Sequence, residues 1–390
     1  MNSPLTNSVF RIAVIGSGPS GFYAAEELIA QSDPEICVDM YDALPTPFGL
    51  VRGGVAPDHQ KIKTVTRVYE KTAAREGFRF FGNVEFGRDI SLDELKSLYS
   101  AVILAVGARS DRKMEIPGED LQGSFPATEF VGWYNGHPDY RHLKFDLSCE
   151  RVAVVGNGNV AMDVARILAS DPKILEQTDI AGYALEALRA SRVKEIYLLG
   201  RRGPAQAAFT NPEIRELCEL PGADLVVDPK ESELDPLSNA EFQTGSLSPA
   251  MKNNVQILKE HSAKPLRGEP KKVIARFLVS PVELIGKDGK VSAMKLEKNQ
   301  LHRTADGSLR PKGAGIFETI PVDMVLRSVG YMGVALPGVP FNAKKGTVPN
   351  ELGRVKNDKD NSTVTGLYVV GWAKRGPSGV IGTNKPDSIE

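Results

Sequence analysis

The chain has 390 residues, a length typical of two or three domains, with 41% hydrophobic residues, 25% charged residues and a net charge of −1. This charge balance argues against a nucleic-acid-binding protein, which would carry a basic excess, and no apolar run approaches the roughly 18 residues that span a membrane. Residues 1–8, which precede the first predicted strand, are too few for a signal or transit peptide, so we expect a cytoplasmic protein.

A strand, a tight turn and a helix are predicted near the start of the chain. Residues 9–15 form an apolar run, residues 22–30 have helical spacing, and the turn between them reads Gly16-Ser17-Gly18-Pro19-Ser20-Gly21. In such a turn the first glycine permits the sharp bend, the second lets a pyrophosphate approach the backbone, and the third lets the helix lie close to the strand. The N–H groups at the start of the helix favour phosphate oxygens.

A second strand, residues 36–41, closes this segment and leads to Asp42. Asp42 follows the last glycine by about 20 residues, which is where the dinucleotide-binding fingerprint has an acid. A carboxylate at this point accepts hydrogen bonds from ribose hydroxyl groups. The segment therefore predicts a dinucleotide site, and the alternative is a turn with only a structural role.

Residues 43–109 are expected to complete a first nucleotide-binding domain. The loop 44–59 is rich in proline and glycine yet apolar, which indicates a functional loop or one folded over a ligand. The other expected elements are a surface helix over 59–75, a pair of strands within 78–86, a helix that Ser91 and Glu94 cap, and a buried strand over 101–108.

A second fingerprint follows the strand predicted at residues 152–155. It reads Gly156-Asn157-Gly158-Asn159-Val160-Ala161, with alanine as the third small residue, and it opens a helix. The next strand, 194–200, ends in Arg201 and Arg202 rather than in an acid. Guanidinium groups match the 2′-phosphate of NADP in fork geometry, so the two arginines predict NADP rather than NAD. The alternative is a solvated basic corner.

The later elements have weaker signals. We expect residues 170–192 to be a partly helical insertion and residues 228–249 to be an irregular, mobile surface excursion. Short apolar runs predict an antiparallel meander over residues 273–279, 282–285, 291–296 and 316–320. Two further strands and a glycine-rich loop are predicted at residues 322–331, 367–371 and 371–383.

The cysteines limit the redox chemistry. Cys37, Cys149 and Cys218 are far apart and no CxxC pair occurs. This pattern excludes a disulfide framework, a four-cysteine iron–sulfur cluster and a vicinal redox disulfide. Redox chemistry in this chain must therefore depend on bound organic cofactors.

Two fingerprints indicate two dinucleotides, and only the second is marked for NADP, so FAD is the natural occupant of the first. Six segments together resemble the adrenodoxin-reductase-type ferredoxin–NADP reductases, and most closely their bacterial members. These segments are residues 16–21, 44–51 (LPTPFGLV), 54–63 (GVAPDHQKIK), 156–161 with Asp163, 200–204 (GRRGP) and 371–383 (GWAKRGPSGVIGT). The resemblance spans nearly the entire chain.

The resemblance implies site residues for both cofactors. Besides the fingerprint glycines Gly16, Gly18 and Gly21, the residues implied for FAD are Ser20, Asp42, Leu50, Glu85 through its backbone, Trp372, Gly379, Val380 and Ile381. The backbone of Gly379 would also meet the nicotinamide. The residues implied for NADP are Gly156, Asn157, Gly158 and Asn159 at the pyrophosphate, Arg201 and Arg202 at the 2′-phosphate, and Glu213 on the ribose side.

Three further residues are implied near the flavin. His59 and Glu216 resemble the family's catalytic pair, with Asp163 in the same neighbourhood, and the alternative for the pair is a structural ion pair. Hydride transfer needs alignment more than an acid, so even a correct assignment predicts a modest catalytic effect. No metal site is expected.

The sequence departs from the family at two places. Asp42 replaces the usual glutamate, which shortens the reach to ribose. The chain ends at Glu390, just after the glycine-rich loop, whereas relatives continue through a helix and a further segment, so the family's C-terminal segment is expected to be lacking. Since isolated short helices are marginal, we expect this loop to be poorly anchored.

We therefore predict an α/β protein with two nested, Rossmann-like, three-layer nucleotide-binding domains. An FAD domain of residues 1–109 and 332–390 would be interrupted by an NADP domain of residues 110–331. The expected activity is FAD-dependent electron transfer from NADPH to a ferredoxin-type iron–sulfur protein, by a monomer without nucleic-acid or membrane partners. The alternatives are the electron-input subunit of a glutamate-synthase-like complex, against which the lack of an N-terminal cysteine cluster counts, and a non-catalytic flavin-binding protein.

A docking face for the iron–sulfur protein is a weaker hypothesis. Basic residues that could face an acidic partner are Lys264, Arg267, Lys271, Lys272 and Arg276. The alternative is that this run of charges is a solvated face.

Overall fold

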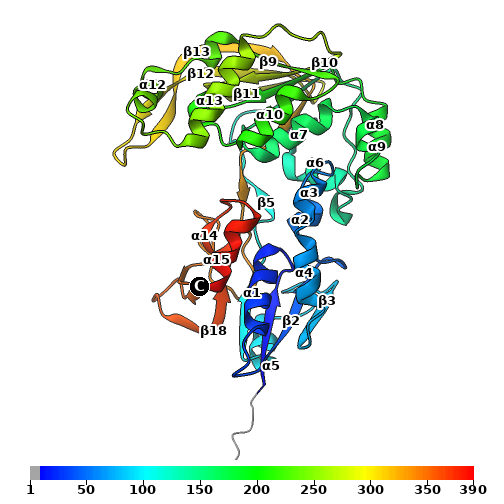
Figure 1. Cartoon of the computed structure of the whole chain (residues 1–390), viewed down its shortest axis with the longest axis vertical. Coiled ribbons are helices and arrows are strands. Elements are labelled where there is room, and N and C mark those ends of the chain that lie inside the picture. Colours follow the sequence, from blue (N-terminus) through cyan, green and yellow to red (C-terminus); the bar gives the residue numbers. More distant parts are fainter. Residues whose placement is uncertain (1–8) are drawn as a thin grey trace, which may run out of the picture. The chain divides into compact units, whose positions relative to one another are not determined.

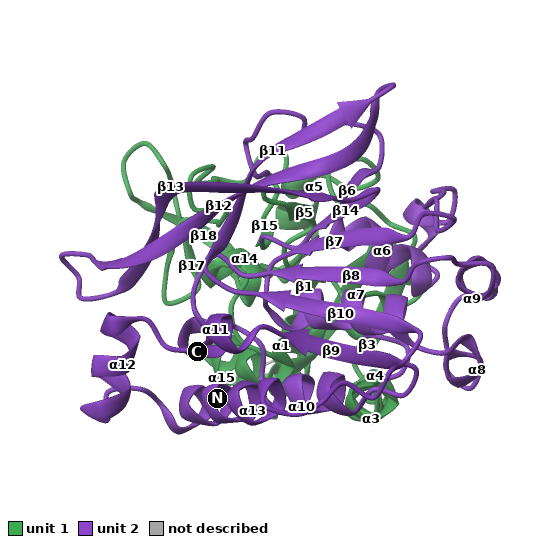
Figure 2. Ribbon diagram, turned by 90° about the horizontal axis from the view of Figure 1, so that it is seen from above, with its two compact units in different colours: residues 1–55, 59–112, 330–390 green, residues 56–58, 113–329 purple. Residues whose placement is uncertain are grey.

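The structure is a computed structural model that describes residues 9–390. Residues 1–8, discussed above as the segment before the first strand, lie outside the described residues. The described chain is α/β, as predicted, and Figure 2 colours its two compact units. Unit 1 contains the chain up to Val55, His59–Arg112 and Gly330–Glu390, and unit 2 contains Ala56–Asp58 and Lys113–Val329. The sequence did not predict that residues 56–58 group with the second unit.

Unit 1 is built on a seven-stranded sheet in the order β16-β17-β18-β4-β1-β2-β3. The strands are β1 Phe10–Ile15, β2 Ile36–Asp42, β3 Phe78–Gly82, β4 Ala101–Leu104, β16 Asn350–Glu351, β17 Arg354–Lys356 and β18 Thr363–Val369. Strands β18, β4, β1, β2 and β3 are parallel, and β16 and β17 extend the sheet in antiparallel fashion. The last strand of the chain therefore lies next to β4, near the middle of the sheet.

Both faces of this sheet are buried, as expected for parallel strands. Along β1, Ile12 and Val14 face a cluster that includes residues of α1 (Pro19–Ile29) and α4 (Thr66–Ala73). Ala13 and Ile15 face the opposite cluster, which includes Leu92 and Leu95 of α5 (Leu92–Leu98). The C-terminal helix α15 (Asn384–Ile389) lies beside α1, as Figure 1 shows.

Unit 2 is built on a six-stranded, fully parallel sheet in the order β6-β14-β7-β8-β10-β9. Its strands are β6 Ser124–Pro126, β7 Arg151–Val155, β8 Glu195–Leu199, β9 Ala223–Val227, β10 Lys271–Arg276 and β14 Met324–Arg327. One face packs against the helices α6 Ala127–Tyr134, α7 Asn159–Ala169, α10 Asn211–Glu219 and α13 Pro249–Ser262. Figure 2 shows α10 and α13 along this sheet.

A second sheet, rather than helices, covers the other face of unit 2. It is antiparallel and contains β11 Val279–Lys287, β12 Lys290–Arg303 and β13 Leu309–Pro321. Leu284, Met294 and Ile320 of this sheet pack on Ala153 and Val325 of the parallel sheet. Unit 2 thus has three layers, of which two are sheets.

Shorter elements connect these layers. The helices are α2 Leu50–Gly53, α3 Gln60–Lys63, α8 Pro172–Leu175, α9 Gly182–Arg189, α11 Pro229–Ser232, α12 Pro236–Gln243 and α14 Trp372–Arg375. Short 3-10 turns lie at Pro138–Tyr140, Pro204–Gln206 and Ile381–Thr383, and β5 Ser110–Asp111 pairs with β15 Tyr331–Met332. Among the described residues, no helix is both long and apolar enough to cross a membrane.

Four predictions of local structure are wrong. The helix expected over 59–75 is divided into α3 and α4, and the strand pair expected within 78–86 is the single strand β3, which ends before Asn83 with its positive φ of 61°. Residues 271–276 join the parallel sheet as β10, between β8 and β9, rather than an antiparallel meander. The excursion 228–249 contains helices α11 and α12, because Asp228 and Asp235 cap them and each is followed by proline.

Candidate nucleotide sites

The turn after β1 has the steric properties that its sequence predicts. Gly16 has a φ of +106°, and a Cβ at Gly21 would collide with the carbonyl oxygen of Gly16. A Cβ at Gly18 would meet no described atom within 4 Å. The first and third glycines are therefore needed for the bend and for the close contact of α1, and the second leaves open space where a phosphate would lie.

Asp42 lies at the end of β2 and is buried. Its carboxylate accepts hydrogen bonds from the backbone N–H of Ser17 at 2.9 Å, the hydroxyl of Ser17 at 2.5 Å and the N–H of Leu44 at 2.9 Å. A carboxylate has about four lone-pair sites, so capacity for a further donor remains. Asp42 therefore holds the turn of the fingerprint as well as offering an acceptor.

A cavity of about 450 Å³ opens beside Asp42 within unit 1. Gly16, Asp42, Glu85 and Arg109 are among its lining residues, and its size is in the range of small-molecule sites. Glu85 points its carboxylate at Arg88, 2.7 Å away, which leaves its backbone as the group available to a ligand. The part of the wall that the sequence did not indicate consists of Val334, Ala335, Leu336 and Pro337.

The loop before α2 folds back onto the fingerprint. Phe48 has a φ of +93°, unusual for a residue with a side chain, and its N–H donates to the carbonyl of Ser17 at 3.0 Å. A Cβ at Gly49 would touch the Cα of Gly18, so only glycine allows this approach. Leu50 begins α2, is 38% exposed and does not line the cavity.

The C-terminal loop carries the remaining residues implied for FAD. Trp372 begins α14, and its indole N–H donates to the carbonyl of Ser378 at 3.1 Å. Gly379 has a φ of +78°, Val380 is 57% exposed, and Ile381 packs against the cluster that contains α1.

The loop is held at several points, so the prediction of poor anchoring is wrong. Asp387 accepts the N–H of Gly371 at 2.6 Å and pairs with Lys374 at 3.0 Å. Ser20 of α1 donates to the side-chain oxygen of Asn384 at 3.1 Å. Tertiary contacts thus stabilise a helix that would be marginal alone.

The second fingerprint opens α7 in unit 2. Gly156 has a φ of +138°, and a Cβ there would collide with the carbonyl oxygen of Ser328. The side-chain nitrogen of Asn157 is buried and has no hydrogen-bond partner within residues 9–390. Such an orphan donor is costly unless an acceptor reaches it, which fits a ligand bound at this turn. Asn159 instead uses its side-chain oxygen to accept the N–H of Thr210 at 2.9 Å.

Arg201 and Arg202 follow β8, as predicted. Arg201 is exposed and Arg202 is half-buried, and neither forms an ion pair with any described residue. Burial lowers the pKa of Arg202, and the nearby guanidinium groups of Arg201 and Arg310 lower it further. Because like charges gather here without an ion-pair partner among the described residues, the electrostatics of the site favour an anion.

Arg166 forms ion pairs with several acidic residues of unit 2, and the sequence analysis did not indicate it. It is buried on α7 and pairs with Asp58 at 2.7 Å, Asp163 at 2.8 Å and Glu213 at 3.1 Å. Glu216 lies 3.5 Å away. Burial alone would lower the pKa of Arg166, but its hydrogen bond to Asp58 and the surrounding carboxylates raise it.

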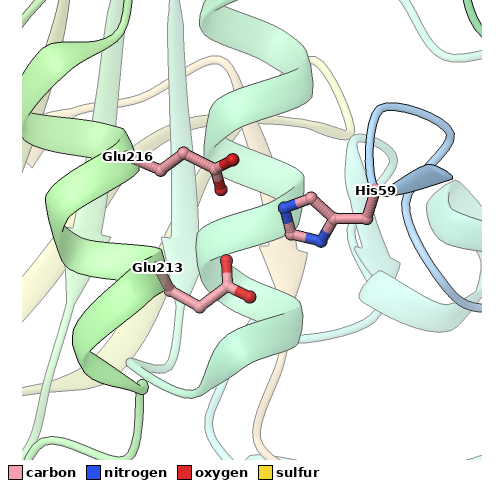
Figure 3. A group of neighbouring side chains, drawn as sticks. All are labelled: His59, Glu213 and Glu216. Atoms are coloured by element: carbon pink, nitrogen blue, oxygen red, sulfur yellow. The ribbon is translucent and has the colours of Figure 1, made fainter. Parts of the chain in front are cut away.

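Glu213 and Glu216 project from the same face of α10, as Figure 3 shows. Their shared contact with Arg166 explains why both point toward α7. His59 precedes α3 and belongs to unit 1, so its pairing with Glu216 stays a prediction.

Two of the cysteines have raised thiol pKa values. Burial raises the pKa of the Cys149 thiol to about 12 and that of Cys218 to about 11, so both are neutral near pH 7.

Three residues of the proposed basic docking face form ion pairs or hydrogen bonds within unit 2. Arg267 pairs with Asp224, Arg276 pairs with Glu231 and Glu318, and Lys271 donates to the carbonyl of Leu168.

Comparison with known proteins identifies the family. Residues 10–216 match the family described as pyridine nucleotide-disulphide oxidoreductase. The NADPH-ferredoxin reductase FprA of Mycobacterium tuberculosis is 48% identical over 383 residues, which cover 97% of this chain and 82% of that protein. The mitochondrial NADPH:adrenodoxin oxidoreductase of Homo sapiens is 43% identical over 389 residues, which cover 97% of this chain and 77% of that protein.

A solved structure of one of these relatives is also similar to this chain. The structure of Mycobacterium tuberculosis FprA in complex with NADPH matches with a TM-score of 0.92 at 48% identity, over 98% of this chain and 83% of that one. The chain therefore belongs to the pyridine nucleotide-disulphide oxidoreductase family, in its group of adrenodoxin-reductase-type NADPH–ferredoxin reductases.

Proposed function

We propose that the protein is an FAD-dependent oxidoreductase that transfers electrons from NADPH to a ferredoxin-type iron–sulfur protein. The observation that carries this proposal is the pair of fingerprints, one followed by Asp42 and the other by Arg201 and Arg202, in a chain 48% identical to an NADPH-ferredoxin reductase. An acid suits the ribose of FAD, and paired arginines suit the 2′-phosphate of NADP.

Unit 1 is assigned to FAD. The open space beside Gly18, the cavity beside Asp42 and the anchored C-terminal loop support this assignment. The residues assigned to FAD are Gly16, Gly18, Ser20, Gly21, Asp42, Leu50, Glu85, Trp372, Gly379, Val380 and Ile381. Bound FAD supplies a two-electron acceptor for hydride that releases electrons singly to a one-electron carrier.

Unit 2 is assigned to NADP. The orphan donor of Asn157, the strained Gly156 and the unpaired guanidinium groups of Arg201 and Arg202 support this assignment. Gly158 and Asn159 begin α7, whose first N–H groups suit a pyrophosphate. Glu213 is assigned to the ribose side of the nucleotide, held in place by Arg166.

His59, Asp163 and Glu216 are assigned to orientation rather than to acid–base chemistry. Hydride transfer requires alignment of two rings and no proton donor at the reacting carbon. Within unit 2, Arg166 fixes Asp163 and Glu216 through ion pairs, which suits a positioning role.

The partner is assigned from the relatives' names, which specify ferredoxin or adrenodoxin. The lone cysteines and the raised thiol pKa values of Cys149 and Cys218 support electron exit from the flavin rather than through a disulfide. Cytoplasmic location and a monomeric state are part of the proposal, and fractionation and light scattering would test them.

Anaerobic titration of the FAD-loaded protein with NADPH tests the proposal. We expect prompt bleaching of the flavin absorbance near neutral pH, with NADH far less effective at the same concentration. Addition of a ferredoxin and cytochrome c should then give turnover that depends on the ferredoxin. No bleaching would indicate an inert flavin-binding protein, and bleaching without stimulation by any ferredoxin would favour a different electron acceptor.

A further inference from the structure

The backbone after β8 is held by the segment that leads into β11. The carbonyl of Gly200 accepts a hydrogen bond from the N–H of Val279 at 3.1 Å, and the carbonyl of Arg202 accepts one from the N–H of Leu278 at 3.2 Å. Both donors are backbone groups, so any residue other than proline could supply them. The carbonyl of Arg201, which lies between these two in the chain, accepts instead from a side chain.

Asn299 supplies this side-chain donor from β12. Its amide nitrogen lies 2.9 Å from the carbonyl oxygen of Arg201 and 2.8 Å from the hydroxyl oxygen of Ser280, so both of its N–H groups have an acceptor. The backbone N–H of Asn299 donates to the carbonyl of Leu278 at 2.7 Å. Asn299 is buried and lies where the pairing of β12 with β13 shifts its register. The orientation of the amide is fixed, because turning it over would place its oxygen against the carbonyl oxygen of Arg201.

The direction of the Arg201 carbonyl matters to an anion bound at this turn. A carbonyl oxygen carries partial negative charge and repels a phosphate group, whereas a guanidinium group attracts it. Asn299 keeps this oxygen in a buried contact with β12. Neither Arg201 nor Arg202 forms an ion pair within residues 9–390, so no carboxylate sets the direction of either guanidinium group. That direction therefore depends on the backbone that carries the two side chains.

We propose that Asn299 is a positioning residue for the 2′-phosphate of NADPH, and that it acts through the backbone of Arg201. It holds the carbonyl of Arg201 away from the phosphate and fixes the point at which the side chains of Arg201 and Arg202 leave the chain. The proposal rests on the proposed NADP site at the two arginines. Asn299 follows Arg201 by 98 residues, so the spacing of the fingerprint cannot indicate it.

Calorimetric binding of adenosine 2′,5′-bisphosphate and of 5′-AMP to the FAD-loaded protein tests this role. Asn299→Ala should weaken the bisphosphate ~3- to 10-fold, the loss expected when one hydrogen bond that holds the site is removed. The affinity for 5′-AMP, which lacks the 2′-phosphate, should stay within ~2-fold of the parent. The KM for NADPH should rise in parallel with kcat unchanged, while the KM for NADH does not rise.

Two further variants separate specificity from stability. Asn299→Leu keeps the shape of the side chain without its donors, so it should lose the same preference without leaving a cavity. Ser280→Ala is the matched control, because it removes the other hydrogen bond of the Asn299 amide and leaves the bond to Arg201. It should lower the free energy of unfolding in urea but bind the bisphosphate as the parent does.

The possible results distinguish this role from the site on which it rests. If Asn299→Ala and Asn299→Leu bind the bisphosphate unchanged, or lose the same factor for 5′-AMP, the role of Asn299 is refuted although the NADP site stands. An equal loss of preference in Ser280→Ala would also refute it, because the bond to Arg201 would not be the one that matters. If the parent itself does not prefer the bisphosphate to 5′-AMP, the proposed NADP site fails first.

Discussion

Unit 1 and unit 2 each place a glycine turn between a buried parallel strand and a helix, yet the strands that follow end in opposite charges. The carboxylate of Asp42 accepts hydrogen bonds from two donors of Ser17 and from the N–H of Leu44, and it keeps capacity for a further donor. Arg201 and Arg202 form no ion pair with a carboxylate of the described residues, and Asn157 contributes an orphan donor. The same strand–turn–helix backbone can therefore bind two different nucleotides. The side chain at the end of the second strand decides whether a ribose hydroxyl or a 2′-phosphate is recognised.

The two fingerprints also differ at the third small residue, and the largest expected effect comes from this difference. In Gly21→Ala, the new Cβ meets the carbonyl of Gly16, so backbone must move, at a cost of about 3 kcal/mol of unfolding free energy. We expect loss of FAD as well, measured by urea unfolding and flavin fluorescence. Ala161→Gly is the control and should cost only about 1 kcal/mol. Equal stability of Gly21→Ala and the parent would contradict the close contact.

Removal of the charge after β8 should have the next largest effect. The double variant Arg201→Ala, Arg202→Ala should raise the KM for NADPH by ~10- to 100-fold and leave that for NADH almost unchanged, because only NADPH carries the 2′-phosphate. Steady-state kinetics with both coenzymes measures this. If both KM values rise equally, the two arginines have a structural role.

Removal of the charge at the end of β2 should have a smaller effect. Asp42→Asn keeps the shape of the side chain but replaces one acceptor oxygen with a donor, at a cost of about 1–2 kcal/mol. The dissociation constant of FAD should therefore rise ~10-fold, while the KM for NADPH measured at saturating FAD should not change. A rise in the KM for NADPH alone would mean that the two sites have been assigned in the wrong order.

The smallest effect is expected at the cysteines, which neither fingerprint uses. Replacement of Cys37, Cys149 and Cys218 by serine or alanine should leave NADPH-to-ferricyanide activity within a few-fold of the parent. In the parent, Cys149 and Cys218 should stay protonated at pH 8 and react slowly with alkylating agents, since burial raises their pKa to about 12 and 11. Loss of activity with FAD still bound would reveal a thiol step.

The parts of the fold that local pattern determines could be predicted from the sequence. Both fingerprints and the capping box of Ser91 with Glu94 are present as expected. Strand β10 was misassigned because a short apolar run does not reveal whether its neighbours are parallel. Helices α11 and α12 were missed, although Asp228 and Asp235, each followed by proline, are helix-start signals.

The site residues that local sequence patterns determine could also be predicted. Asp42, Arg201 and Arg202 follow from spacing, because the ends of neighbouring parallel strands meet at one edge of a sheet. Arg166 and the cavity wall at residues 334–337 depend on contacts between segments far apart in the chain, which spacing does not encode. The anchoring of the C-terminal loop was misjudged for the same reason, since Asp387 and Asn384 act through tertiary contacts.

The position of β18 has a consequence for synthesis on the ribosome. Strands β1 to β4 emerge early, but the sheet places β18 between β4 and β17, so one side of β4 stays unpaired until Val369 has been translated. The hydroxyl of Ser20 in α1 likewise gains its hydrogen-bond acceptor, Asn384, only after a further 364 residues have been translated. Translation completes unit 2, which ends at Val329, before it completes unit 1. Because unpaired strand edges invite aggregation, we expect chaperones to protect the nascent N-terminal segment during this interval.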